Sequence, residues 1–196
     1  MRLIVGLGNP GRDYENNRHN VGFMAVDAFV HELGETWKFW GPGKNSEVAQ
    51  ASIDGEKIIF QKPLTFMNLS GQAVVAAATF FKVLPEDICA VHDDLDLPFG
   101  EVRLKAGGGD GGHNGLKSLT KALTSPDYAR VRMGIGRPPH PGMDAAAFVL
   151  QDFSNSEFDT VDAMIGHAIQ GMKAFAGGGE KFRLEMNTLN RFSGKE

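Results

Sequence analysis

Residues 1–33, MRLIVGLGNPGRDYENNRHNVGFMAVDAFVHEL, decide the fold class. Leu3 to Val5 form a short apolar run that is closed by glycine, which is typical of a buried strand. From Val21 to Leu33 the apolar residues recur at helical spacing, and Asn20 is the candidate N-cap. A strand that is followed by a helix in this way indicates an α/β architecture.

The rest of the chain repeats this alternation. Two apolar runs, 48–53 and 57–61, flank Asp54-Gly55, which is a strong hairpin signal. Further strands are predicted at 88–91, 102–104 and 131–135, and helices at 70–81, 116–123, 154–177 and 180–189, the third opened by a Ser154/Glu157 capping box. The hairpin and the short link 93–100 imply some antiparallel pairing. We therefore expect a mixed, mostly parallel twisted sheet with helices on both faces.

Length and composition limit the remaining classes of protein. The 196 residues show no repeat and no linker, so we expect a single domain, 1–196. The one cysteine, Cys89, excludes an intramolecular disulfide framework and a cysteine-based zinc site. No apolar run approaches the roughly 20 residues of a membrane helix, and the first residues do not form a signal peptide. A soluble, cytoplasmic protein without a membrane partner is expected.

The charge distribution is uneven along the chain. The net charge of −4 argues against a protein that coats nucleic acid with its whole surface. Residues 101–140 nevertheless hold seven basic and three acidic side chains, a net charge of +4, which leaves −8 on the remainder. This segment indicates either a local basic face for one anionic partner or a scatter of solvated charges.

Candidate chemistry lies in the loops that follow the predicted strands, because ligands of doubly wound sheets bind beyond the carboxyl ends of the strands. Four such loops carry amide, carboxylate, histidine or aromatic side chains. Their residues of interest are Asn9, Tyr14 and His19 after the first strand, Phe66, Met67 and Asn68 after the hairpin, His92 to Asp96 after the buried strand, and His113 and Asn114 after the glycine-rich run 107–112.

Several familiar sites are disfavoured. Residues 6–11, GLGNPG, match the dinucleotide fingerprint by letter, but the helix starts only near Asn20 and no acidic residue ends a second strand at the required distance. The glycine-rich run lacks the Lys-Ser or Lys-Thr pair of a phosphate-binding P-loop. Covalent catalysis is disfavoured because Cys89 lies in an apolar strand and no Gly-x-Ser-x-Gly elbow exists. A magnesium or manganese site built from residues 92–96 and His113 stays an alternative, since spacing alone does not exclude it.

Histidine acting on water is the chemistry that remains. His19 precedes a predicted helix, whose positive end favours the neutral imidazole that accepts a proton. A carboxylate such as Asp93 or Asp94 would fix its tautomer and stabilise the imidazolium formed in the transition state. The alternative is that His19 only bonds to its own loop.

The motifs that carry these residues occur in a fixed order. They are GLGNPG at 6–11, Tyr14, RHNxG at 18–22, TFMNLSG at 65–71, HDDLDLP at 92–98 and GGHNGL at 111–116. Together they resemble the bacterial peptidyl-tRNA hydrolases across nearly the whole chain. The resemblance implies a phosphorylase/hydrolase-like α/β domain, usually monomeric, without cofactor or metal, that acts on peptidyl-tRNA and not on DNA.

The resemblance also implies roles for single residues. The family hydrolyses the ester between the peptide and the terminal ribose of tRNA, with His19 activating the water and Asp93 supporting it. The implied substrate contacts are Asn9, Tyr14, Phe66, Met67, Asn68, His113 and Asn114. The implied tRNA contacts are Arg103, Lys105 and Arg132.

The residue types at these positions agree with these implications. Side-chain amides both donate and accept hydrogen bonds, so asparagines can hold a peptide backbone of any sequence. Arg103 and Lys105 share one face of a predicted strand, as do Arg130 and Arg132, and phosphate contacts of this kind position a tRNA without reading its sequence. One departure is Asp110, where some relatives have histidine, and its negative charge could weaken phosphate contact. A rival class is an RNA-binding protein of this fold without hydrolase activity.

Overall fold

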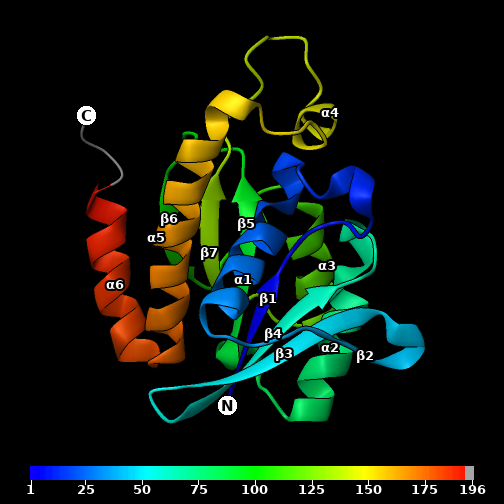
Figure 1. The fold of residues 1–196 in the computed structure, drawn as a ribbon, viewed down its shortest axis with the longest axis vertical. Coiled ribbons are helices and arrows are strands. Elements are labelled where there is room, and N and C mark those ends of the chain that lie inside the picture. Colours follow the sequence, from blue (N-terminus) through cyan, green and yellow to red (C-terminus); the bar gives the residue numbers. More distant parts are fainter. Residues whose placement is uncertain (193–196) are drawn as a thin grey trace.

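The computed structural model describes residues 1–192, and it contains one seven-stranded sheet in the order β2-β3-β4-β1-β5-β7-β6 (Figure 1). The strands are β1 (Arg2–Gly6), β2 (Lys38–Trp40), β3 (Ser46–Ile53), β4 (Glu56–Pro63), β5 (Ile88–Asp94), β6 (Val102–Ala106) and β7 (Ala129–Gly134). The central strands β4, β1, β5 and β7 are parallel, whereas β2, β3 and β6 pair antiparallel to their neighbours. The predicted mixed, mostly parallel sheet is therefore confirmed.

Helices cover both faces of the sheet, as predicted. Their bounds are α1 (Val21–Glu32), α2 (Ser70–Phe81), α3 (Asn114–Leu123), α4 (Ala145–Val149), α5 (Phe158–Ala176) and α6 (Gly179–Phe192). Helices α1, α5 and α6 pack on one face, and α2 and α3 pack on the other (Figure 1). The short helix α4 lies beyond the end of the sheet.

The alternation of side chains along β1 explains how one strand serves two cores. Ile4 belongs to the cluster under α1 and α5, whereas Leu3 and Val5 belong to the cluster under α2 and α3. All three side chains are fully buried, because successive side chains of a strand point to opposite faces and both faces are covered.

Gly22 brings the start of α1 close to the sheet. A Cβ atom at this position would lie 2.3 Å from the carbonyl oxygen of Val91 and 2.6 Å from that of Leu7. Only glycine permits this approach between helix and strand backbones. As a result, the residues immediately before α1 lie at the carboxyl end of β5.

Several details differ from the sequence prediction. The strand β2 and the helix α4 were not predicted, because three and five residues are too short for a periodic pattern. The short link after β5 does not join adjacent strands, since β7 lies between β5 and β6. Asn20 occupies the N-cap position of α1 but makes no side-chain capping bond there. Among residues 1–192 there is no helix long and apolar enough to cross a membrane.

Candidate active site

A cleft of about 720 Å³ opens at the carboxyl ends of β1, β4 and β5. It collects residues from all four loops that the sequence singled out. Its lining includes Asn9, Tyr14, His19, Phe66, Met67, Asn68, His92, Asp93, Asp94, Asp110, His113, Asn114, Ala145, Ala146, Val149 and Leu150. Segments far apart in sequence therefore meet in a single cleft.

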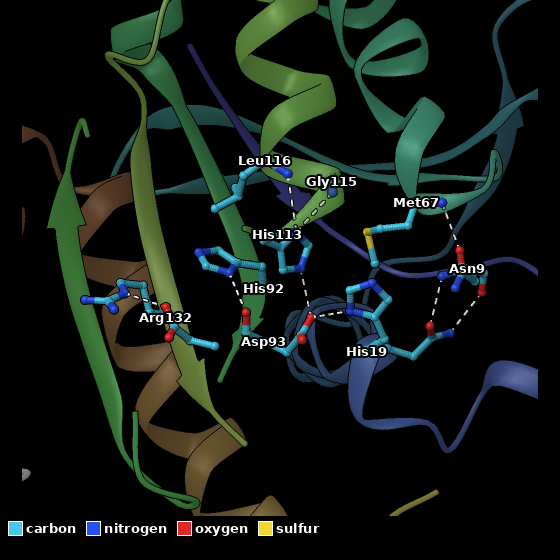
Figure 2. A network of polar contacts seen from close by, with 11 residues as sticks. Asn9, His19, Met67, His92, Asp93, His113, Gly115, Leu116 and Arg132 are labelled. Carbon is cyan, nitrogen blue, oxygen red and sulfur yellow. Dashed lines mark hydrogen bonds and ion pairs between the residues drawn. The ribbon is translucent and has the colours of Figure 1, made fainter. Parts of the chain in front are cut away.

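His19 and Asp93 form the centre of this site. His19 lies in a one-turn helix, Arg18–Asn20, that leads directly into α1, and Asp93 lies near the end of β5. His19 Nδ1 donates to Asp93 Oδ1 over 2.8 Å (Figure 2). This bond places the proton of a neutral imidazole on Nδ1 and leaves the Nε2 lone pair to accept another.

His113 contacts the same carboxylate oxygen from the other side. Its Nε2 donates to Asp93 Oδ1 over 2.9 Å, while its Nδ1 accepts the backbone N–H groups of Gly115 and Leu116 at the start of α3 (Figure 2). His113 is thus the N-cap of α3. Because both ring nitrogens are bonded within the protein, the neutral Nε2–H tautomer of His113 is fixed.

The two histidines keep Asp93 ionised. Asp93 is 3% exposed, and burial alone would raise its pKa. His113 and His19 outweigh that effect and hold the pKa of Asp93 far below its ordinary value. Burial also lowers the pKa of the neighbouring His92 to about 3, so that ring is neutral and adds no charge at neutral pH.

The backbone of Asn9 is held by the side chain of Asn20, and the side chain of Asn9 makes one further hydrogen bond. Asn20 accepts the backbone N–H of Asn9 and donates to its carbonyl oxygen, each over 2.9 Å. This pairing explains why Asn20 does not cap α1. Asn9 Oδ1 accepts the backbone N–H of Met67 over 2.8 Å, which leaves the Nδ2 group of Asn9 as a donor at the cleft.

Of the other predicted substrate residues that line the cleft, Met67 is 4% exposed, and the remaining four are more accessible. Asn68 and Asn114 are exposed, one in the turn Met67–Leu69 and the other in the first turn of α3. Tyr14 and Phe66 meet edge to face, with ring centroids 6.4 Å apart. Phe66 is 56% exposed, so its ring is available to a ligand.

The three groups His19, Asp93 and His113 are close enough to hold a metal ion, but their hydrogen bonds do not suit one. A metal-ligating histidine normally donates its second N–H to an acceptor. In His113 the second nitrogen instead accepts two backbone N–H groups, so the proton must stay on Nε2, the atom that would bind the metal. Ligation would require α3 to lose its cap.

Comparison with known proteins identifies the family. A sequence model described as Peptidyl-tRNA hydrolase matches residues 3–196. The peptidyl-tRNA hydrolase of Nocardia farcinica is 47% identical over 171 residues, which cover 87% of this chain and 88% of that protein. The chain belongs to the peptidyl-tRNA hydrolase family. It is an enzyme of this family, as the sequence motifs predicted.

Solved structures agree with this assignment. The crystal structure of peptidyl-tRNA hydrolase from Acinetobacter baumannii is 37% identical, with a TM-score of 0.88, and the match covers 97% of this chain and 94% of that chain. The Arabidopsis thaliana 5'-methylthioadenosine nucleosidase is 10% identical with a TM-score of 0.52 over 99% of this chain and 96% of that chain. The second likeness concerns the fold alone, and it confirms the phosphorylase/hydrolase-like architecture.

A peptidyl-tRNA hydrolase must also hold the tRNA, and the basic residues predicted for this purpose lie outside the cleft. Arg103 and Arg132 are directly opposite each other in the antiparallel β6–β7 pair, and Lys105 lies two residues further along β6. Asp94, the second candidate partner for His19, instead accepts from Arg132 Nε over 2.8 Å. That ion pair holds the Arg132 side chain against Asp94, which lines the cleft.

Arg130 corrects one sequence expectation about this face. Although it alternates with Arg132, its side chain is 1% exposed and is covered by the glycine-rich loop. It donates to the carbonyl oxygens of Gly108, Pro126 and Tyr128. Arg130 therefore anchors the loop that precedes α3 and is not available to phosphate.

Some residues of the peptidyl-tRNA hydrolase site were missed by the sequence analysis. Arg18 was quoted only as part of a motif, yet it ties the His19 turn to the segment between α4 and α5: it pairs with Glu157 over 2.9 Å and lies over the rings of Phe148 and Phe153. The wall formed by α4 was also missed. Two alanines of α4, Ala145 and Ala146, line the cleft, and small exposed side chains carry no sequence signal for such a role.

Proposed function

We propose that the chain, acting as a single monomeric domain, hydrolyses the ester bond between the peptide and the terminal ribose of peptidyl-tRNA, with His19 as the general base for a water molecule. The observation that carries this proposal is the bond from His19 Nδ1 to the ionised Asp93, which leaves Nε2 of His19 as a proton acceptor at the cleft. No covalent intermediate or metal takes part.

The proposed reaction has two steps. A water oxygen attacks the ester carbonyl carbon while His19 Nε2 takes one of its protons, and a tetrahedral intermediate forms. The bond from that carbon to the ribose oxygen then breaks, and His19 returns the proton to the departing oxygen. The products are a peptide with a free carboxyl group and a tRNA with a free ribose hydroxyl.

Asp93 and His113 support this cycle without touching the ester. The carboxylate of Asp93 stabilises the imidazolium of His19 in the transition state. His113 holds that carboxylate from the opposite side and is itself fixed by α3. We therefore assign His113 to positioning Asp93, although the family resemblance had suggested a substrate contact.

The polar rim of the cleft suits the peptide side of the substrate. Asn9 retains an N–H₂ donor, and Asn68 and Asn114 are exposed with both donor and acceptor groups. We propose that these amides hold the peptide backbone and the ester region whatever the peptide sequence is. Tyr14, Phe66 and Met67 line the same cleft and would contact the terminal nucleotide and the wall of the groove.

Hydrolysis of a defined ester tests the enzyme against its rival, an RNA-binding protein of the same fold. The protein should release the acyl group from an N-acetylated aminoacyl-tRNA with the same rate before and after treatment with a chelator, because the two backbone bonds to Nδ1 of His113 keep the proton on the Nε2 atom that would bind a metal. Release of free amino acid derivative and deacylated tRNA is measured by chromatography. Binding of the tRNA without release would support the RNA-binding alternative, and loss of activity with the chelator would support a metal mechanism.

The salt dependence of binding tests the basic face formed by Arg103, Lys105 and Arg132. If these side chains bind phosphates, affinity for deacylated tRNA should fall as salt rises, since counterions are released on binding. Lys105→Ala should reduce the slope of log K against log salt by about 0.7–0.9, the contribution of one phosphate contact. The matched control is Lys57→Ala, an exposed lysine on β4, which should leave the slope unchanged. Equal slopes in parent and Lys105→Ala would remove β6 from the proposed tRNA surface.

A further inference from the structure

The strand that carries Arg103 and Lys105 lies at the edge of the sheet. Within the described part of the chain, residues 1–192, β6 pairs with β7 on one side only, and it is the last strand in the sheet order. The backbone groups on the outer side of an edge strand have no strand to bond. An edge strand of five residues with such groups open to water frays readily.

Asn190 of α6 occupies the place of the missing strand. Its Oδ1 accepts the backbone N–H of Leu104 over 2.9 Å, and its Nδ2 donates to the carbonyl oxygen of the same residue over 3.0 Å. One carboxamide thus bonds both backbone groups of one residue, as a neighbouring strand would. A side-chain carboxamide offers a donor and an acceptor side by side, as this arrangement requires.

Leu104 is the residue between the two basic side chains. Its own side chain is 2% exposed and packs toward Gly171 of α5, so Arg103 and Lys105 project from the opposite face of the strand. A clamp on the backbone of Leu104 therefore fixes the backbone on both sides. Held in this way, the two cations lose less freedom when they bind phosphates.

We infer that Asn190 is a positioning residue for the tRNA body: it holds β6 so that Arg103 and Lys105 are presented to the phosphates. The inference rests on the proposed function. It assigns to the last helix a part in substrate binding that is separate from the chemistry at His19, because Asn190 bonds the backbone of Leu104 and neither residue lines the cleft.

The helix itself does not depend on Asn190. α6 is anchored by Phe182, which packs edge to face on Phe175 of α5 with ring centroids 5.8 Å apart. Leu189 is also buried, at 8% exposure. Removal of the Asn190 carboxamide should therefore release β6 without detaching α6.

The experiment compares Asn190→Ala with the parent on two substrates that share the same ester. One is an N-acetylated aminoacyl-tRNA, and the other is the same N-acetylated aminoacyl ester of adenosine, which has no tRNA body. For the tRNA substrate, KM should rise about threefold to tenfold with kcat unchanged, since in the variant the two cations become ordered only when the tRNA binds, and that ordering weakens binding. For the adenosine ester, kcat/KM should equal that of the parent. Asn187→Ala, on the exposed surface one turn earlier in α6, is the matched control and should match the parent on both substrates.

Deuterium exchange supplies the structural measurement. In Asn190→Ala the peptide that contains residues 102–106 should exchange faster, whereas peptides from α5 and β5 should exchange as in the parent. An equal loss on both substrates would make Asn190 a general stabiliser and overturn the inference, as would an unchanged KM for the tRNA substrate together with faster exchange. If the parent itself releases no acyl group from either ester, the proposed function fails rather than the role of Asn190.

Discussion

Replacement of His19 by alanine is expected to lower kcat for release of the peptide from peptidyl-tRNA by about 10²- to 10⁴-fold, the usual contribution of a general base. Affinity for the tRNA should change by less than about twofold, because we propose that most of the affinity comes from phosphate contacts on β6 and β7 rather than at His19. Single-turnover release with enzyme in excess gives the rate of the chemical step, and filter binding of deacylated tRNA gives the affinity.

A second histidine provides the control for this variant. His31 is exposed in the last turn of α1, the helix that follows His19, and His31→Ala should retain the parent rate. Equal single-turnover rates for His19→Ala and the parent would contradict the proposed mechanism. A large loss of tRNA affinity in His19→Ala would show instead that His19 binds the substrate.

Asp93→Asn is expected to have the second large effect, and it separates charge from geometry. Both histidines donate to the same oxygen of Asp93, Oδ1, so an asparagine carbonyl could accept both bonds. The variant therefore removes the negative charge while it keeps the two rings in place. Loss of the charge that stabilises the imidazolium should lower kcat by about 10²- to 10⁴-fold with little change in KM.

The same variant is also expected to change how the stability of the fold depends on acid pH. The pKa of Asp93 is lowered in the folded protein, whereas in the unfolded chain it is about 3.9. Its stabilising contribution is therefore complete well above pH 4 and is lost progressively as the pH falls below that value toward the folded pKa. Thermal unfolding from pH 7 to pH 3 should show a smaller acid-induced decrease in Tm for Asp93→Asn than for the parent. Parallel curves would contradict the assignment of an ionised Asp93, and Asp162→Asn, an exposed carboxylate on α5, is the control.

Most helices and strands could be predicted from the sequence because apolar spacing, capping residues and turn residues lie within the element itself or next to it. The Ala-rich segment 70–81 has the bounds of α2, and the predicted capping box of Ser154 and Glu157 is present at the turn that leads into α5. The insertion of β7 between β5 and β6 could not be predicted, since strand order depends on contacts far apart in sequence. Arg130 is buried because the glycine-rich loop passes over it. The alternation of side chains along a strand carries no information about the path of that loop.

In the candidate site, too, the residues could be predicted from local motifs, but their pairing depended on contacts far apart in sequence. Sequence motifs named His19, Asp93 and His113, but not which aspartate His19 would meet. Side-chain alternation places Asp93 on the face with Cys89 and Val91, which α1 covers, and this is why His19 at the start of α1 meets Asp93. Asp94 points to the other face, toward Arg132. The choice between them required the knowledge of which helix covers which face.

The glycine-rich loop and the buried thiol together offer a way to observe the cleft directly. Burial raises the pKa of Cys89, the one cysteine of the sequence, so this thiol is unreactive. Gly109 has open space around its would-be Cβ and, unlike Gly107, Gly108, Gly111 and Gly112, an ordinary backbone conformation. A Gly109→Cys substitution would thus create one selectively labelled position beside the entrance, where a fluorescent dye could report in real time when substrate arrives and product departs.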